Sequence, residues 1–174
     1  MLEHSIAERP ARAFFGSERH LFINETSMTV RLEKDSQRRW RTIVLCNRGS
    51  ELLMVEMVDP LTKKFIWSLP GGGIEQDETP LVAAKRELFE ETGHQAEDWA
   101  FLEQTRYDFG WNGRMVPCLG EWFRARTPSV SDTHTIIDAH VRDWAWIPLG
   151  QVSERLAYQP HVRSRTLHHL RDMI

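Results

Sequence analysis

The segment from Gly71 to His94 reads GGGIEQDETPLVAAKRELFEETGH, and it is the most informative part of the chain. It places a glycine-rich turn ahead of a helix. Thr79 is the expected N-cap of that helix, Pro80 takes its first position, and Gly93 lies just past its end. Because both ends carry their own signals, the sequence predicts a helix over residues 80–92.

Three acidic residues of this helix, Glu87, Glu90 and Glu91, lie close together along a stripe beside the apolar face. Like charges at this spacing repel one another and cost helix stability. A cation among them removes that cost, and ligands that are all oxygen favour a hard ion such as Mg²⁺ or Mn²⁺. The sequence therefore predicts a metal site on the helix, and a solvated, glutamate-rich face is the alternative.

Apolar runs on both sides of the helix predict strands. They cover residues 27–34, 41–47, 52–57, 65–69, 102–109, 115–126 and 141–147. Asn112-Gly113 is a strong signal for a tight turn between two of these strands, and Pro160 begins a second predicted helix. The apolar face of the first helix should consist of Leu81, Ala84 and Leu88. Strands and helices interleave, so the predicted fold class is α/β or α+β with a mixed sheet.

Bulk properties exclude several classes of protein. The 174 residues suit one domain with a single core, and a net charge of −3 gives no support to a nucleic-acid polymer as partner. No apolar run approaches the roughly 18 residues of a membrane span, and the N-terminus lacks the pattern of a secretory signal. Cys46 and Cys118 lie far apart in apolar runs, which indicates two buried thiols and no disulfide. We expect a cytoplasmic protein with no membrane partner.

Two regions are expected along the chain. Residues 1–38 mix charges and aromatic side chains without a clear period, and we expect them to form an N-terminal extension that packs on the domain through Phe14, Phe15 and Phe22. Residues 39–174 form the predicted domain.

The spacing of the central segment resembles a known signature. It consists of Gly72, five residues, Glu78, seven residues and then RELFEETGH from Arg86 to His94. This resembles the Nudix hydrolase signature G-x5-E-x7-R-E-U-x-E-E-x-G-U, in which U is a bulky aliphatic residue. Only the last position departs, because His94 replaces an aliphatic side chain there. The segments FIWSLPGG and DWAWIPL are also similar to Nudix sequences, and the resemblance covers about residues 39–172.

The resemblance implies an α/β/α sandwich with a mixed sheet. It also implies hydrolysis of the pyrophosphate bond in a nucleoside diphosphate linked to another moiety, such as a nucleotide sugar, ADP-ribose or a nucleoside triphosphate. The cofactor would be Mg²⁺, or Mn²⁺ in its place. Its implied ligands are carboxylates and one backbone carbonyl: Glu87, Glu90, Glu91, Glu78, and Gly72 or Gly71.

Catalysis needs a group that takes the proton of the attacking water. We expect Glu90 or Glu91 to do so. Asp138 and Glu121 are weaker candidates for a supplementary ligand or base.

Arg86 is the third predicted member of the catalytic set. It would pair with Glu90 at i+4 or with Glu78 in the loop, and would keep its partner ionised and aimed.

Contacts with a small-molecule nucleotide substrate are predicted in two places. Gly71, Gly72 and Gly73 allow a close backbone approach that a side chain would block. Tyr107 and Trp111 occupy alternate positions that lead to the hairpin turn, where they could stack on a nucleobase. Packing within a buried sheet face is the alternative for these rings.

Two further possibilities stay open. A Nudix-like module that senses a nucleotide without cleaving it is the alternative function, although no carboxylate of the motif is missing. The N-terminal extension and the last helix could also form the surface of a homodimer. The sequence does not select one substrate.

Overall fold

A computed structural model describes residues 37–127, 136 and 138–171 of the chain. The strands are β1 (Arg39–Arg48), β2 (Glu51–Val58), β3 (Phe65–Ser68), β4 (Glu97–Trp111), β5 (Arg114–Arg126) and β6 (Val141–Pro148). The helices are α1 (Pro80–Thr92), α2 (Leu149–Arg155) and α3 (Pro160–Arg171). The strands form one sheet in the order β3-β2-β1-β5-β4, and β6 pairs with β2. Only the β1–β5 pairing is parallel among those described, so the sheet is mixed, as predicted.

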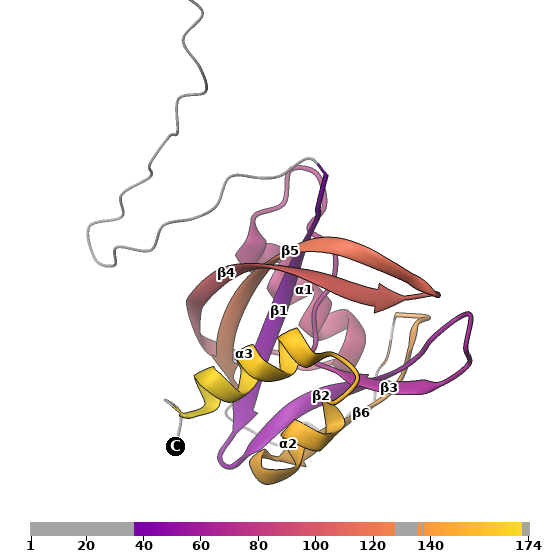
Figure 1. Ribbon diagram of the computed structural model, residues 1–174. Coiled ribbons are helices and arrows are strands. Elements are labelled where there is room, and N and C mark those ends of the chain that lie inside the picture. The colour runs from indigo at the N-terminus through magenta and orange to yellow at the C-terminus, as the bar shows by residue number, and fades with distance from the viewer. Residues whose placement is uncertain (1–36, 128–135, 137, 172–174) are drawn as a thin grey trace, which may run out of the picture. The chain divides into compact units, whose positions relative to one another are not determined.

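Helices cover both faces of this sheet, which gives the α/β/α sandwich expected from the sequence. In Figure 1, α3 lies in front of the sheet and α1 behind it. On the front face, Val152 of α2 and Leu170 of α3 pack in one core with Trp122 of β5. On the other face, Ala84 and Leu88 of α1 pack in a second core against β1, β2 and β5. The second core fixes which side of α1 faces the sheet.

The ends of α1 lie where the sequence predicts them. The hydroxyl oxygen of Thr79 accepts a hydrogen bond from the backbone N–H of Val82 at 3.3 Å. At the other end, Gly93 has a φ of 71° and donates its N–H to the carbonyl of Phe89 at 2.7 Å. These contacts satisfy backbone groups that a helix leaves open at its ends.

The predicted apolar face of α1 was partly wrong. Ala84 and Leu88 are fully buried, but Leu81 is 36% exposed. The buried stripe passes through Ala83 instead and continues through Glu87 and Glu91. These two carboxylates therefore lie on the face that meets the sheet, and not on an adjoining stripe.

The six predicted strands that fall on described residues are all present, with ends that differ by a few residues. Asn112 and Gly113 have φ values of 52° and 69°, as a tight two-residue turn requires. Cys46 and Cys118 are buried and free, as predicted. The short helix α2 had not been predicted.

The predicted strand over residues 27–34 and the contacts expected from Phe14, Phe15 and Phe22 lie outside the described residues, so the N-terminal extension stays a prediction. Within the described part of the chain, no helix is long and apolar enough to cross a membrane.

Candidate active site

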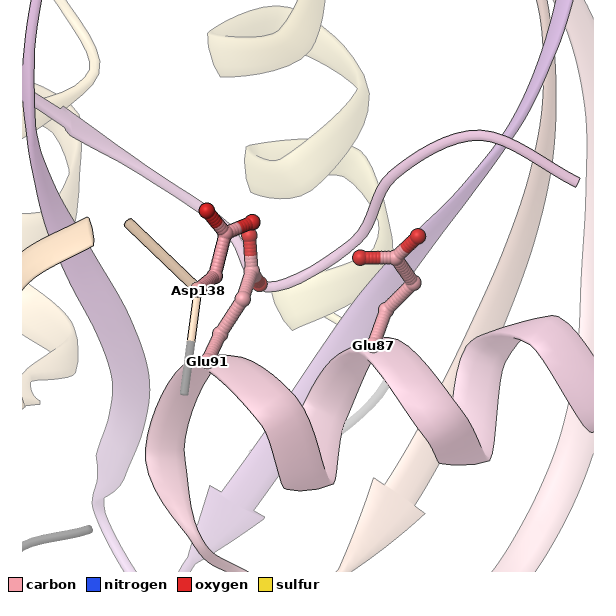
Figure 2. Close-up of side chains that lie close together, drawn as sticks. All are labelled: Glu87, Glu91 and Asp138. Carbon is pink, nitrogen blue, oxygen red and sulfur yellow. The ribbon is translucent and has the colours of Figure 1, made fainter. Parts of the chain in front are cut away.

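Three carboxylates from two distant parts of the chain meet beside α1. Figure 2 shows Glu87 and Glu91 rising from α1, with Asp138 beside Glu91. Each side chain offers one oxygen, and these three oxygens all lie within 4.8 Å of one another. Glu87 is 7% exposed and Glu91 is 2% exposed. A donor set made only of carboxylate oxygens suits a hard divalent ion, so these residues fit the metal that the resemblance of the motif implies.

Asp138 reaches this group because the chain before β6 is tied to the end of α1. Its backbone N–H donates to the carbonyl of Glu90 at 3.3 Å. Its own carbonyl accepts from the N–H of Val141 at 3.2 Å, and its Oδ1 accepts from the N–H of His140 at 2.7 Å. The segment therefore forms a turn that enters β6 with the Asp138 carboxylate beside α1.

Glu121, the other supplementary candidate, lies on β5 in register with Thr42 of β1, and its role as a ligand or base stays a prediction. It is 1% exposed, and its Oε1 accepts hydrogen bonds from Trp40 Nε1 at 3.2 Å and Gln104 Nε2 at 2.6 Å. These partners lie on the strands that flank β5, so Glu121 is part of a polar cluster within the sheet.

The glycine turn packs directly against the carboxylates. The N–H of Gly71 donates to Glu91 Oε2 at 2.8 Å. A Cβ added at Gly72 would lie 2.4 Å from the carboxylate carbon of Glu87, and one added at Gly71 would lie 2.2 Å from the carbonyl oxygen of Thr42. A side chain at Gly72 would therefore clash with Glu87, and one at Gly71 would clash with the backbone of β1. Contact of Gly71, Gly72 and Gly73 with substrate stays a prediction.

Arg86 connects the turn to α1 through five hydrogen bonds. Nε and Nη2 each donate to one oxygen of Glu78 at 2.9 Å, and Nη2 also donates to the carbonyl of Gly73 at 3.0 Å. Nη1 donates to Glu87 Oε1 at 2.9 Å and to Glu90 Oε2 at 3.0 Å. A guanidinium has five N–H donors, so each of them has a partner. Arg86 thus pairs with both residues that the sequence left as alternatives.

Glu78 and Glu90 are partners of Arg86 and lie outside the three-carboxylate group. Glu78 Oε2 also accepts from the N–H of Glu75 at 3.1 Å, which orients the loop, and the Arg86 hydrogen bonds hold the pKa of Glu78 below its usual value. The Glu90 side chain is 37% exposed. Metal binding by either residue, and proton transfer by Glu90, stay predictions.

The electrostatics of the site favour a cation. Burial raises the pKa of Glu91 well above its usual value; the N–H of Gly71 opposes this, and the negative charges of Glu87 and Asp138 add to it. Burial also raises the pKa of Glu87, against the hydrogen bond from Arg86. Two buried carboxylates that resist ionisation gain most from a positive ion placed between them.

A row of aromatic rings leads away from the carboxylates. His140 follows Asp138 by two residues, and its ring meets Trp111 edge to face, with centroids 6.1 Å apart. Trp111 is half-buried and stacks on Phe109, also with centroids 6.1 Å apart. The predicted substrate residue Trp111 therefore lies within one ring contact of the segment that carries Asp138.

Arg41 is a site residue that the sequence analysis missed. Its guanidinium carbon lies 4.6 Å from the centroid of the Phe109 ring, and its Nη2 donates to the carbonyl of Gly71 at 3.2 Å. Its charge opposes the burial that raises the pKa of Glu87 and Glu91. The one available signal was a cation within the apolar run RTIVLCN.

Two other predicted positions are packing sites. Tyr107 is 6% exposed and stacks face to face on His161 of α3 at 5.3 Å, which supports the core alternative; substrate contact by Tyr107 stays a prediction. His94 is 3% exposed, and its ring meets Trp144 and Trp146 edge-on at 4.5 and 5.5 Å. His94 therefore fills the volume of the aliphatic residue that it replaces.

Known proteins similar to this chain have the same fold. Among solved structures, a NUDIX hydrolase from Nitrosomonas europaea superposes with a TM-score of 0.63 at 20% identity, over 76% of this chain and 89% of that chain. The NUDIX domain of Shewanella oneidensis NrtR, complexed with ADP ribose, superposes with a TM-score of 0.57 at 18% identity, over 77% and 93%. At these identities the likeness shows the fold.

Sequence comparisons identify the family. Residues 36–170 match the NUDIX domain model. An RNA pyrophosphohydrolase of Roseobacter denitrificans is 32% identical over 128 residues, which cover 66% of this chain and 78% of the relative. An RNA pyrophosphohydrolase of Cellvibrio japonicus is 31% identical over 150 residues, which cover 74% and 82%. The chain therefore belongs to the NUDIX family, and it is a Nudix hydrolase of the pyrophosphohydrolase type.

Proposed function

We propose that the protein hydrolyses the pyrophosphate bond of a nucleoside diphosphate derivative and uses Mg²⁺ held by Glu87, Glu91 and Asp138. The observation that carries this proposal is the group of three carboxylate oxygens within 4.8 Å, set against the glycine turn. Water adds to one phosphorus of the anhydride, the bridging P–O bond breaks, and two phosphorylated products leave. When bound, the divalent ion would neutralise phosphate oxygens and act as a Lewis acid.

We assign three further roles to side chains of this protein: orientation of the carboxylates, proton transfer and contact with the substrate phosphate. Arg86 keeps Glu87 and Glu90 aimed, because its donors bridge both carboxylates to the loop. Glu90 is half-exposed and beside the site, so we propose that it, or Glu91, takes the proton of the attacking water. Arg41 lies beside the buried carboxylates and is the cation that we expect to contact a substrate phosphate.

The nucleoside part of the substrate is proposed to contact Trp111. This ring is half-buried at the end of β4 and contacts His140. An aromatic face at this position suits a nucleobase, because every base offers a π-face for stacking.

The 5′ end of RNA is a second candidate substrate. The two curated relatives described above are RNA pyrophosphohydrolases. In addition, α3 contains three arginines and no acidic residue within Pro160–Arg171; one of the three, Arg165, pairs with Glu103. A cationic helix would help to hold the phosphates of an RNA chain.

The test is a hydrolysis assay on a panel of substrates with identification of products by mass spectrometry. The panel contains ADP-ribose, diadenosine tetraphosphate, dGTP and a 5′-triphosphorylated oligoribonucleotide, each with and without Mg²⁺. Turnover of one of them that depends on Mg²⁺ and is lost in Glu91→Gln, but not in the exposed control Glu154→Gln, supports the proposal. Tight binding of one compound without turnover of any would favour the nucleotide sensor instead.

Two other proposals accompany this function. We propose a cytoplasmic location, because nucleotide substrates are present there and the free thiols of Cys46 and Cys118 stay reduced. A homodimer is proposed as an assembly that uses the N-terminal extension or α3, and light scattering of the full chain would measure its mass.

A further inference from the structure

Asp59 follows β2 and holds together the loop of residues 59–64. The side chain is buried, and its Oδ1 accepts from the N–H of Leu61 at 3.1 Å, the N–H of Thr62 at 2.7 Å and the hydroxyl of Thr62 at 2.9 Å. Its backbone N–H and carbonyl pair with Lys64 and Lys63, at 3.0 and 2.9 Å. The loop is therefore folded around one carboxylate.

The second oxygen of Asp59 reaches a different part of the chain. Oδ2 accepts from the backbone N–H of Asn112 at 2.9 Å, 53 positions away in sequence. The Leu61 side chain lies against the same turn, because a Cβ added at Gly113 would be 2.3 Å from Leu61 Cδ2. The loop that Asp59 organises thus rests on the Asn112–Gly113 turn.

This turn is the tip of the β4–β5 hairpin, and it carries Trp111. Within the described sheet, β4 is an edge strand with β5 as its one neighbour. Beside the tip, the Tyr158 hydroxyl donates to the Gly110 carbonyl at 3.2 Å, so the Asp59 bond is the one that holds the turn residue Asn112 itself. Trp111 immediately precedes Asn112, and its ring contacts His140, two residues from Asp138. A shift of the tip would therefore move a ring that contacts the segment carrying Asp138.

We propose that Asp59 is a positioning residue for substrate binding, which anchors the Asn112–Gly113 turn so that Trp111 stays in place against the nucleoside part of the substrate. This inference rests on the proposed function. The chemistry explains why an aspartate stands here. Donors from two separate segments meet at its two oxygens, and a carboxylate is the short side chain that accepts at both.

The sharp test is Asp59→Asn, which keeps size and shape but turns one acceptor into a donor. One of the two segments then faces a donor, so the link to Asn112 or the loop itself is lost. We expect KM for ADP-ribose and for a 5′-triphosphorylated oligoribonucleotide to rise about tenfold while kcat stays within about twofold. Amide hydrogen exchange at Asn112, measured by NMR, should become faster.

Two further variants separate positioning from general stability. Thr62→Val removes one bond to Oδ1 and leaves the Asn112 bond intact, so it should lower the melting temperature without changing KM. Leu61→Ala alters an exposed side chain that rests on Gly113, so it folds and should raise KM in the same direction by a smaller factor.

The outcomes are distinct. Unchanged KM in Asp59→Asn and Leu61→Ala, beside an active wild-type protein, overturns the inference and leaves the proposed function in place. If the wild-type protein hydrolyses neither probe nor any other substrate of the panel, the proposed function fails and the inference fails with it. Exchange at Asn112 then reports separately whether Asp59 holds the turn.

Discussion

Replacement of Glu91 by glutamine tests the metal site with the least change in shape. The side chain is 2% exposed and accepts the N–H of Gly71 at 2.8 Å, a bond that the glutamine oxygen can keep. What is lost is one negative charge among three clustered carboxylates. We therefore expect the metal-free variant to be at least as stable as wild type, because burial and its neighbours already disfavour the charge.

The loss should appear in the response to metal. A ligand at 100 times its Kd stabilises the folded state by about 2.7 kcal/mol, or about 5–10 °C in the melting temperature of a domain of this size. Removal of one of three charged ligands should weaken affinity at least tenfold and take away about 1.4 kcal/mol of that gain. Turnover should fall about a hundredfold or more, a barrier increase of about 2.7 kcal/mol.

The assay is a melting curve in EDTA and at increasing Mg²⁺, with kcat measured on the same samples. Glu154→Gln is the matched control, since it removes one exposed carboxylate of α2. A Glu91→Gln protein that keeps the wild-type rate and the full Mg²⁺-dependent rise in melting temperature would refute the reasoning.

Three other perturbations probe the same site. Glu90→Gln should cut turnover by orders of magnitude and leave the fold intact; a near-wild-type rate would remove Glu90 from the catalytic set. Gly72→Ala places a methyl group 2.4 Å from the Glu87 carboxylate, so we expect a loss of about 1–3 kcal/mol in stability together with weaker Mg²⁺ binding, measured by denaturation and calorimetry. Burial raises the pKa of Glu91 and Glu87 in the folded protein above the value near 4.3 of an unfolded chain. At pH values between the unfolded and the folded pKa, the folded metal-free protein therefore binds more protons than the unfolded chain. Its stability should fall as pH rises through that window, and the rise in melting temperature caused by Mg²⁺ should be larger at about pH 7.5 than at about pH 5. Equal rises at both pH values would contradict this assignment.

Local signals explain which parts of the fold were predictable. Thr79, Pro80 and Gly93 act on backbone groups within their own helix, so both ends of α1 could be placed from sequence. Asn112-Gly113 fixed the β4–β5 turn for the same reason. The short helix α2 follows Pro148 without a side-chain cap, so it gave no comparable signal.

Tertiary contacts explain what was not predictable. Helical spacing alone could not tell whether Leu81 or Ala83 would face the sheet, because this depends on how α1 is rotated against β1. Asp138 joins the carboxylates through a backbone bond to the end of α1, which no sequence spacing reveals. Arg41 was missed because a cation in an apolar strand has no local partner that marks it.

The residues of the motif were found from the sequence, and so were Glu78 and Glu90 as partners of Arg86. Gly72 was expected to make room for substrate, a contact that stays a prediction, and the sequence did not reveal that the Glu87 carboxylate also lies against it. The Glu90 carboxylate pairs with Arg86, which was one of the two predicted pairings, and metal binding by Glu90 stays a prediction. The motif therefore predicts which residues form the site, and the contacts in the structure show which residue each of them pairs with.

Anomalous scattering from crystals grown with Mn²⁺ in place of Mg²⁺ tests the central claim most directly. We predict an anomalous peak coordinated by oxygens of Glu87, Glu91 and Asp138. A peak located elsewhere, or none at these carboxylates at millimolar Mn²⁺, would contradict the account.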